Sequence, residues 1–352
     1  MSGMHRFLIL GTGHMAARHA EQFGLLPGCH LVAAVDLDAE RARIYAATHN
    51  IPRTFADLEA AIAWGGFDVA VNATPDAVHA TTSLKLIAAG KAVFCEKPLA
   101  LNAPDAFGMT EAAEAAGVLT MVNFTYRNAH AIQRARLMID EGAIGAVRHI
   151  EASYLQSWLT AKHWGDWRKE ERWLWRLSTA HGSNGVLGDI GVHLLDFVSF
   201  GTGLDFAGLE ARLKTFDKAG GGRIGAYTLD ANDSVAITAE MANGALASLH
   251  MTRFATGNLN DLNLAIYGER GGLKIWANHL ESRLDACLGH DMDHQTWRPV
   301  SCPPTPRNEA RFAEALRSGQ GAEPAFRRAA EIQRLIDLCV LSDREGRWLS
   351  AS

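Results

Sequence analysis

The chain has 352 residues, enough for two domains, and its 48% hydrophobic and 21% charged content is typical of a globular protein with a large core. Its 34 basic and 39 acidic residues leave a net charge of −5, without a long run of either sign. These values argue against nucleic acid and anionic membranes as partners, and no apolar stretch reaches the roughly 20 residues that a membrane helix needs.

The five cysteines are scattered along the chain and form no CxxC pair. This pattern favours reduced thiols in the cytoplasm over a disulfide framework or a structural zinc site. The apolar run Phe7–Leu10 is too short for the core of a signal peptide. We therefore expect a soluble, cytoplasmic protein.

The first predicted strand, Phe7–Leu10, runs into a glycine-rich turn and then into a helix-compatible segment. Gly11 suits the tight turn, Gly13 lets a pyrophosphate approach the backbone, and Ala16 allows close packing of helix on strand. The helix presents its N–H groups and positive dipole end to the anion. We expect a cofactor here, bound by Gly11, Thr12, Gly13, His14 and Met15.

A second buried strand, 31–35, ends at Asp36, whose carboxylate can accept the ribose hydroxyls of an adenosine half. The same carboxylate would repel a 2′-phosphate, and the next arginine is Arg41. Asp36 therefore favours NAD over NADP. The alternative is that Asp36 merely caps the helix that begins near Asp38.

Strands and helices alternate up to about residue 123, which predicts a parallel sheet with helices on both faces. The expected helices cover 39–49, 56–63, 76–90 and 104–116, and the expected strands cover 68–72, 92–95 and 119–122.

The pattern changes after residue 123, where β-like runs from 209 to 276 follow one another with little helix between them and predict a largely antiparallel sheet. We also expect a strand over 147–156, a flexible glycine-rich loop over 217–225, and helices over 129–141, 186–200, 308–317 and 325–341.

Glu96-Lys97-Pro98 follows a predicted strand, at the carboxyl edge where open α/β sheets bind ligands. A lysine is usually only a solvated loop residue. Its place beside the expected cofactor favours a functional role, with Pro98 restraining the turn and Glu96 orienting the ammonium group.

Asp189 and His193 are four residues apart, so they share one face of the predicted helix. A histidine can exchange a proton near neutral pH, and a nearby carboxylate can orient it. The alternatives are a purely structural pair, or Asp196 as the carboxylate that holds His193.

Five motifs in this order resemble the Gfo/Idh/MocA oxidoreductases, a family that includes glucose–fructose oxidoreductase and inositol dehydrogenase: Gly11–Ala16, Asn72–Pro75, Glu96–Pro98, Tyr126-Arg127 and Gly188–His193. The resemblance spans residues 5 to about 276 and fits a closing C-terminal helix. It implies a nicotinamide cofactor, sugar or polyol substrates, and a C-terminal open sheet that is often used for oligomerisation.

The expected fold class is therefore α/β, with an N-terminal Rossmann domain and a C-terminal α+β domain built on an open, mainly antiparallel sheet. We expect the NAD-binding domain over 1–125, the substrate-binding and oligomerisation domain over 126–307, and helices that pack back on the core over 308–352. The expected assembly is a homo-dimer or homo-tetramer.

The resemblance implies a catalytic set in which Lys97 contacts substrate and cofactor, Asp189 positions the reacting hydroxyl, and His193 is the acid/base. It further implies that Thr74, Pro75 and His79 line the cofactor cleft with Glu96 and Lys97, and that Asn123 approaches the nicotinamide. The expected substrate-binding residues are Lys97, Tyr126, Arg127, Trp175, Arg176, Asp189 and His193.

The segment 158–175 departs from the family, because it holds five of the nine tryptophans. Aromatic faces suit the apolar side of a sugar ring, and the interleaved arginine and aspartate side chains can bind its hydroxyls. The alternative is a packed wall or a subunit interface. Trp175 and Arg176, which are nearest the Asp189 helix, are expected to face the pocket.

His290 and His294 flank two aspartates and could bind a metal. The segment resembles a polar loop and the expected chemistry needs no metal, so we expect none.

These features predict an NAD-dependent enzyme that transfers a hydride between the nicotinamide and a secondary alcohol of a sugar, cyclic polyol or sugar derivative. The alternatives are an NAD-dependent glycoside hydrolase, which uses transient oxidation and elimination, and a non-catalytic NAD-sensing protein. A sensor would not need Lys97, Asp189 and His193 together.

Overall fold

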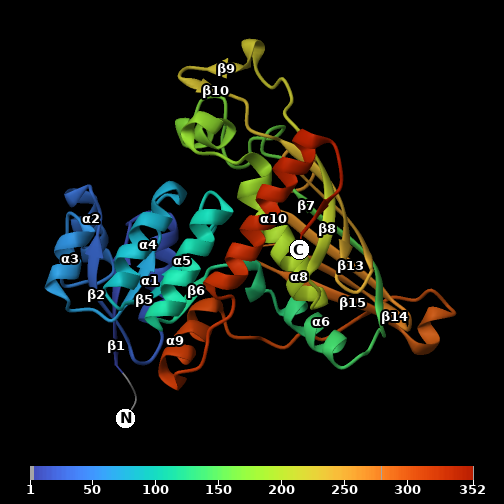
Figure 1. The fold of residues 1–352 in the computed structure, drawn as a ribbon, viewed down its shortest axis with the longest axis horizontal. Coiled ribbons are helices and arrows are strands. Elements are labelled where there is room, and N and C mark those ends of the chain that lie inside the picture. Colours follow the sequence, from blue (N-terminus) through green and yellow to red (C-terminus); the bar gives the residue numbers. More distant parts are fainter. Residues whose placement is uncertain (1–3, 279, 352) are drawn as a thin grey trace. The chain divides into compact units, whose positions relative to one another are not determined.

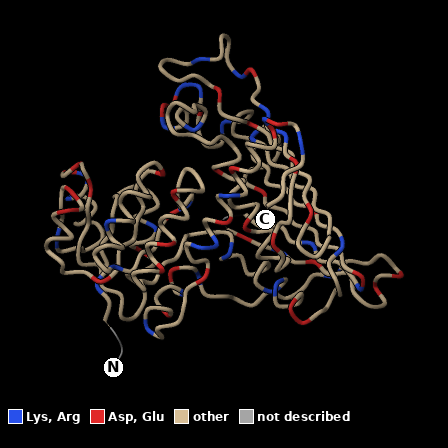
Figure 2. Tube along the Cα trace, viewed as in Figure 1, with Lys and Arg blue, Asp and Glu red and all other residues tan. Residues whose placement is uncertain are grey.

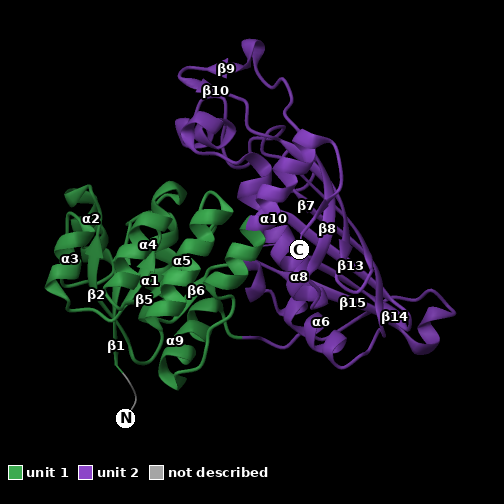
Figure 3. Cartoon of the chain, viewed as in Figure 1, with its two compact units in different colours: residues 1–124, 306–333 green, residues 125–305, 334–352 purple. Residues whose placement is uncertain are grey.

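The computed structural model describes residues 4–278 and 280–351. The chain forms two compact units (Figure 3). The first contains the residues up to Phe124 and Pro306–Gln333, and the second contains Thr125–Thr305 and the residues from Arg334 onward. Basic and acidic residues are interspersed along the chain in both units (Figure 2), as the balanced composition predicts.

The first unit is built on a six-stranded sheet with the order β3-β2-β1-β4-β5-β6, in which every neighbouring pair is parallel. The strand order reverses between β1 and β4, and doubly wound sheets bind ligands beside the carboxyl ends of the strands at such a point. The strands are β1 (His5–Leu10), β2 (Cys29–Val35), β3 (Thr54–Phe55), β4 (Val69–Asn72), β5 (Ala92–Cys95) and β6 (Thr120–Val122).

Helices of this unit begin where the sequence supplies capping groups. Asp38, Asp57 and Asn102 each accept a backbone N–H at the start of a helix. The predicted helix over 76–90 begins with a 3₁₀ turn, Asp76–Val78. The helices are α1 (His14–Gly24), α2 (Ala39–Thr48), α3 (Leu58–Trp64), α4 (His79–Ala88), α5 (Ala103–Ala116), α9 (Asn308–Ser318) and the start of α10 (Phe326–Glu345).

The core of the first unit joins the beginning of the chain to its end. Phe7 of β1 packs on Phe23 of α1, and Phe94 of β5 packs on Phe312 of α9 with ring centroids 5.4 Å apart. Helix α9 therefore completes the core that β1 and α1 begin.

The second unit contains a nine-stranded open sheet with the order β16-β15-β14-β13-β7-β12-β11-β8-β17. Its neighbouring strands are antiparallel except for the parallel pair β7 and β12, which confirms the expected mainly antiparallel sheet. The strands are β7 (Val147–Leu155), β8 (Phe206–Lys214), β11 (Ser234–Met241), β12 (Leu246–Thr252), β13 (Asp261–Gly268), β14 (Gly271–Ala277), β15 (Ser282–Leu288), β16 (Arg298–Pro299) and β17 (Leu349–Ser350).

Apolar and polar side chains alternate along strands such as β11, so the apolar side chains share one face of the sheet, and that face is buried. Helices α6 (His130–Asp140) and α8 (Val192–Thr202) pack on that face (Figure 1). A Cβ atom added at Gly201 of α8 would lie 2.6 Å from Ile132 of α6 and 2.9 Å from Leu264 of β13, so glycine permits the close approach of these three elements.

Two segments of the second unit differ from the sequence-based expectation. The predicted helix over 186–200 begins as a π turn, Leu187–Gly191, and becomes α-helical only from Val192. The predicted loop over 217–225 contains a 3₁₀ turn, and its end forms β9 (Arg223–Ile224), which pairs with β10 (Tyr227–Thr228). Gly221 and Gly222, both with positive φ, let the chain turn into this hairpin.

Within the described ranges, the helices are too short or too polar to cross a bilayer.

Candidate active site

The turn after β1 distinguishes its two glycines. Gly11 has a φ of +83°, and an added Cβ atom would lie 2.7 Å from the carbonyl oxygen of Ala73, so the fold itself requires glycine there. Gly13 has an ordinary φ of −80°, and no described atom lies within 4 Å of an added Cβ. Glycine at position 13 therefore leaves the backbone open to a ligand.

The start of α1 differs from those of α2, α3 and α5. Those three helices have a side-chain cap, whereas among the described residues no side chain caps α1 at Gly13, nor the starts of α4 and α9. Gly13 and His14 are exposed, while Thr12 is buried and Met15 is half-buried. An uncapped and accessible helix N-terminus fits the pyrophosphate of a dinucleotide.

Asp36 lies directly beside this turn. Its carboxylate accepts hydrogen bonds from the backbone N–H (3.0 Å) and hydroxyl (2.7 Å) of Thr12, from the N–H of Asp38, and from Nε (3.1 Å) and Nη2 (2.5 Å) of Arg41. Burial alone would raise the pKa of Asp36, but the hydrogen bonds from Arg41 and Thr12 outweigh it and lower the pKa well below its usual value.

The side chain that caps α2 belongs to Asp38, not to Asp36. Asp36 is thus not the cap of α2, in contrast to the alternative in which it merely caps that helix. The ion pair with Arg41 was not predicted from the sequence, although a basic residue in the first turn of the following helix is a usable signal.

The loops after β4 and β5 are tied together by His79. This side chain is fully buried, and its ring nitrogens lie 2.7 Å from the carbonyl oxygen of Pro98 and 2.9 Å from that of Thr74. Thr74 is half-buried, Pro75 is exposed, and the Lys97–Pro98 peptide bond is cis. His79 therefore holds the two loops together from their buried side and is not part of their exposed surface.

Glu96 lies in a buried charge cluster formed by His19, Glu96 and Glu309. The ring nitrogens of His19 lie 2.7 Å from a carboxylate oxygen of Glu96 and 3.0 Å from one of Glu309. Burial lowers the pKa of His19, but hydrogen bonds with Glu309 and Glu96 outweigh this effect and raise it to about 9. The imidazolium is thus the stable form, with one cation between two carboxylates.

This cluster holds the backbone next to Lys97. Glu96 accepts the backbone N–H of Lys97 (3.2 Å) through one carboxylate oxygen and the side-chain amide of Asn123 (2.8 Å) through the other. Asn123 is buried and accepts a hydrogen bond from Asn308 of α9. Lys97 is half-buried. The sequence analysis missed His19 and Glu309, yet a histidine on the apolar face of α1 (Ala16, Ala20, Phe23) is a detectable signal.

In the second unit, Asp189 lies within the π turn that leads into α8. A Cβ atom at Gly188 would lie 2.3 Å from Cβ of Asn184, and one at Gly191 would lie 2.7 Å from the sulfur of Met251, so both glycines are needed for this packing. Single π turns inserted before or within α-helices occur frequently at functional sites.

Two arginines approach the Asp189 carboxylate. Nη2 of Arg253 donates to Oδ2 at 3.0 Å, and Nε of Arg176 lies 3.9 Å from the same oxygen. Arg253 is fully buried, whereas the side chains of Arg176 and Asp189 are 32% and 28% exposed. The carboxylate and Arg176 are therefore both within reach of solvent.

His193 is 7% exposed and packs against two tyrosines. The ring of Tyr126 lies edge-on to it with centroids 5.2 Å apart, and that of Tyr154 lies at 6.4 Å. Tyr126, Tyr154 and Asn260 form a closed cycle of hydrogen bonds, and burial raises the pKa of Tyr126 to about 12. Tyr126 thus fixes the imidazole through its ring, while its hydroxyl belongs to the cycle.

Arg127 and Asp196 form a second buried pair. Nε and Nη2 of Arg127 donate to the two carboxylate oxygens at 2.9 and 2.6 Å, and the guanidinium lies 4.6 Å above the ring of Phe200. Asp196 is therefore paired with Arg127. Asp189 is the carboxylate near the start of α8 that is open to solvent.

The tryptophan-rich segment is mainly a packed wall. Trp158 and Trp167 are 4% and 2% exposed and form a hydrophobic cluster with Leu159, Leu174, Leu177 and Leu229. The hairpin β9–β10 packs against this cluster through Ile224 and Tyr227. Trp175 and Arg176 are half-buried, and the guanidinium of Arg176 stacks 4.4 Å from the ring centroid of Trp175.

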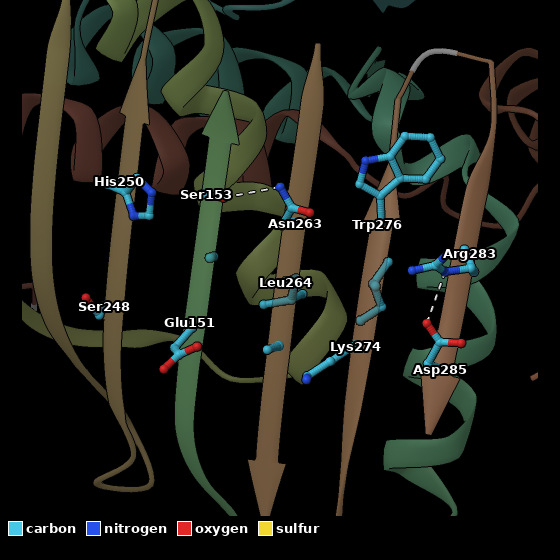
Figure 4. A pocket seen from close by; sticks show the side chains of 13 residues that line it. Glu151, Ser153, Ser248, His250, Asn263, Leu264, Lys274, Trp276, Arg283 and Asp285 are labelled. Atoms are coloured by element: carbon cyan, nitrogen blue, oxygen red, sulfur yellow. Dashed lines mark hydrogen bonds and ion pairs between the residues drawn. The ribbon is translucent and has the colours of Figure 1, made fainter. Parts of the chain in front are cut away.

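Two other features lie apart from these residues. His290 and His294 are exposed with their Nε2 atoms 3.1 Å apart, and the described part of the chain contains no group of three potential metal ligands. The polar face of the nine-stranded sheet carries a hollow of about 410 Å³ lined by residues such as Glu151, His250 and Trp276 (Figure 4). None of the site residues predicted from the sequence lines that hollow.

The predicted residues fall into two groups. The cofactor residues and Lys97 belong to the first unit, whereas Tyr126, Arg127, Trp175, Arg176, Asp189 and His193 belong to the second.

Comparison with known proteins identifies the same two parts. Residues 5–124 match the oxidoreductase family with an NAD-binding Rossmann fold, and residues 132–274 match the GFO/IDH/MocA C-terminal domain. Levoglucosan dehydrogenase of Pseudarthrobacter phenanthrenivorans is 25% identical, over 97% of this chain and 96% of its own. The scyllo-inositol 2-dehydrogenase (NADP(+)) of Bacillus subtilis is 34% identical, over 44% of this chain and 46% of its own.

A solved structure of levoglucosan dehydrogenase in complex with NADH shares the fold. It has a TM-score of 0.87 and 24% identity, and the alignment covers 99% of each chain.

Proposed function

The chain belongs to the Gfo/Idh/MocA oxidoreductase family, and from this premise we propose that it transfers a hydride between NAD and a secondary alcohol of a sugar, cyclic polyol or sugar derivative. The observation that carries the proposal is the pair at the start of α8, where His193 packs against two tyrosine rings and Asp189 is partly open to solvent. The similarity to levoglucosan dehydrogenase over nearly the whole chain supports the substrate class.

Each residue has a proposed role that follows from its chemistry. His193 accepts the proton of the reacting hydroxyl, and Asp189 orients that hydroxyl through a hydrogen bond. Lys97 stabilises the negative charge that develops on oxygen, which is effective because its backbone is held by Glu96 before the substrate arrives. When bound, the nicotinamide supplies the hydride acceptor.

We propose that the first unit holds the dinucleotide through the backbone of 11–15 and through Asp36. The uncapped start of α1 and the room beside Gly13 fit the pyrophosphate. The ionised carboxylate of Asp36 suits a ribose diol and disfavours a 2′-phosphate, so NAD is the proposed cofactor. Arg41 is neutralised by Asp36 and is not available to attract a phosphate at that position.

We further propose that the protein forms a homo-dimer or homo-tetramer through the polar face of the nine-stranded sheet. That face contains paired charges, such as Arg283 with Asp285 (3.0 Å), and the half-buried ring of Trp276. Sedimentation at micromolar concentration tests this assignment, and a monomer would contradict it.

The test of the activity is nicotinamide absorbance on mixing the protein with NAD⁺ or NADP⁺ and a panel of inositols, aldoses, anhydrosugars and sugar acids. NADH formation with one class is the expected result. A response confined to NADP⁺ would overturn the role of Asp36. The absence of any turnover, with NAD binding retained, would contradict the proposed reaction.

A further inference from the structure

The carboxylate of Asp189 has two cationic neighbours. Arg253 and Arg176 both approach its Oδ2 atom, at 3.0 and 3.9 Å. Two guanidiniums and one carboxylate leave one positive charge in excess. Asp189 can therefore neutralise only one of the two arginines.

Arg253 is the one that needs Asp189. It is fully buried, and its guanidinium lies 4.9 Å from the ring centroid of Trp158. A guanidinium removed from water requires a counter-charge and well-placed acceptors. Its Nη1 donates to the carbonyl oxygen of Arg176 (3.1 Å), and its Nη2 donates to that of Gly185 (3.3 Å) and to Asp189.

The other carboxylate close to Arg253 is already occupied. Asp233 forms an ion pair with Lys218 at 2.6 Å, and both side chains are almost fully buried. The buried charges thus pair as Lys218 with Asp233 and Arg253 with Asp189. Arg253 is therefore a positioning residue that holds Asp189, and the tryptophan wall supports it through Trp158.

Arg176 is left with its charge largely uncompensated and with its side chain 32% exposed. Its contact with Asp189 is the one ion pair that it makes within the described residues. Its guanidinium lies over the rings of Trp175 and Trp173, 4.4 and 5.5 Å from their centroids, and its Nη1 donates to the carbonyl oxygen of Arg172 (3.4 Å), so the side chain is ordered before a ligand binds. A stacked, preordered guanidinium binds a planar oxyanion with little loss of side-chain entropy.

The segment of the chain around Arg176 also carries a net positive charge. Residues 158–177 contain five basic and three acidic side chains, in a chain whose net charge is −5. All three acidic groups have other partners, because Asp166 pairs with Lys162, Glu170 pairs with Arg172, and Glu171 accepts the hydroxyl of Tyr227. A local positive excess attracts anions.

Resting on the proposed function, we propose that the substrate carries an oxyanion, a carboxylate or a phosphate, which Arg176 binds while Arg253 holds Asp189 for the reacting hydroxyl. The substrate class is thus an acidic sugar or polyol. Neutral sugars lack the group that would neutralise Arg176.

The test compares matched neutral and acidic substrates, namely aldoses with their aldonates and uronates, and hexoses with their phosphates. We expect kcat/KM for the acidic member to exceed that of its neutral partner by at least about 10-fold, in keeping with a charge-assisted hydrogen bond. The carboxylate and phosphate arms show which oxyanion is preferred. Equal or better turnover of the neutral members would overturn the proposal.

Arg176→Met is expected to remove this preference by raising KM for the acidic substrate roughly 10–100-fold, with little change in kcat. Arg176→Lys should restore part of it. The matched control is Arg172→Met, since Arg172 also lies over Trp173 but is 67% exposed and paired with Glu170. An Arg176→Met variant that slows acidic and neutral substrates equally would show that Arg176 only supports Asp189, which would contradict the proposal.

A binding measurement separates this proposal from the proposed function. Titration calorimetry of aldonate, uronate and hexose phosphate needs no turnover. If no substrate is oxidised, binding of one acidic sugar that is lost in Arg176→Met would still support the oxyanion site. No detectable binding of any acidic sugar to the wild-type protein would overturn it.

Discussion

The two units contain charge clusters of opposite composition. In the first, one imidazolium, His19, lies between the carboxylates of Glu96 and Glu309. In the second, one carboxylate, Asp189, lies between the guanidiniums of Arg253 and Arg176. Each cluster is linked to a proposed catalytic group. Glu96 holds the backbone of Lys97, and Asp189 is itself the residue that we propose to orient the substrate.

The clusters differ in exposure, and this difference separates support from function. The three side chains of the first cluster are at most 9% exposed, so its charges are neutralised within the protein, by one another and by Arg307 beside Glu309. In the second cluster Arg253 is buried, whereas Asp189 and Arg176 are about one third exposed. A closed cluster fixes a loop, while an open one can exchange a protein contact for a substrate contact.

The largest expected effect concerns the histidine beside the open cluster. His193→Ala should slow turnover by roughly 10²–10⁴-fold, because it removes the proposed acid/base. NAD binding, measured by calorimetry, should change little, since the cofactor residues lie in the other unit. Undiminished turnover would remove His193 from the mechanism.

Breaking the closed cluster should affect stability more than chemistry. His19→Gln leaves two buried carboxylates without their shared cation, and we expect it to lower the free energy of unfolding by about 3 kcal/mol. Urea unfolding measures this change. The control is Arg43→Gln, which breaks an exposed pair with Glu40 and should have a much smaller effect on stability. Equal effects of the two substitutions would contradict the supporting role of His19.

The closed cluster should also make stability depend on pH. The pKa of His19 is raised from 6.5 to about 9 in the folded protein, so its contribution is complete below 6.5 and is lost as the pH rises through 9. The pKa of Glu96 is lowered from 4.5 to about 2, so its contribution is present above 4.5 and is lost as the pH falls through 2.

Urea unfolding of wild type and His19→Gln at about pH 6 and about pH 10 tests the basic side of this window. The difference between the two proteins should shrink at the higher pH. A difference that does not depend on pH would mean that His19 is neutral in the folded protein.

A smaller effect is expected at the cofactor. Asp36→Ser removes the carboxylate that neutralises Arg41, so Arg41 becomes available to a 2′-phosphate. We expect the ratio of kcat/KM for NADP⁺ to that for NAD⁺ to rise roughly 10–100-fold. The double variant Asp36→Ser/Arg41→Met should lose most of that gain. An unchanged ratio in the single variant would contradict the role of Asp36.

Local signals in the sequence were sufficient for the elements of the first unit except the two-residue strand β3, which was not predicted. The strand predicted over 92–95 coincides with β5, because a short apolar run is bounded by a glycine turn and by Pro98. The π turn before α8 and the hairpin β9–β10 were missed, because both depend on packing against distant residues such as Met251 and Trp158. Such contacts leave no periodic pattern in the chain.

The same limit applies to the site. Asp36, Asp189 and His193 could be proposed from motif spacing, but the partners that are distant in the chain could not. Arg253 is 64 residues from Asp189, and Glu309 is 290 residues from His19. A lone charged residue in a sequence usually indicates a solvated surface. Only the folded chain distinguishes Arg253, fully buried, from Arg172, which is solvated.

The most direct test of the proposed chemistry follows the hydride itself. A substrate identified in the panel is deuterated at the carbon to be oxidised, and the nicotinamide is then analysed by mass spectrometry. We predict one deuterium in the reduced nicotinamide for each molecule of ketone formed. Deuterium returned to the same carbon with no net reduction of the nicotinamide, accompanied by cleavage of a glycosidic bond, would contradict the dehydrogenase and indicate transient oxidation followed by elimination.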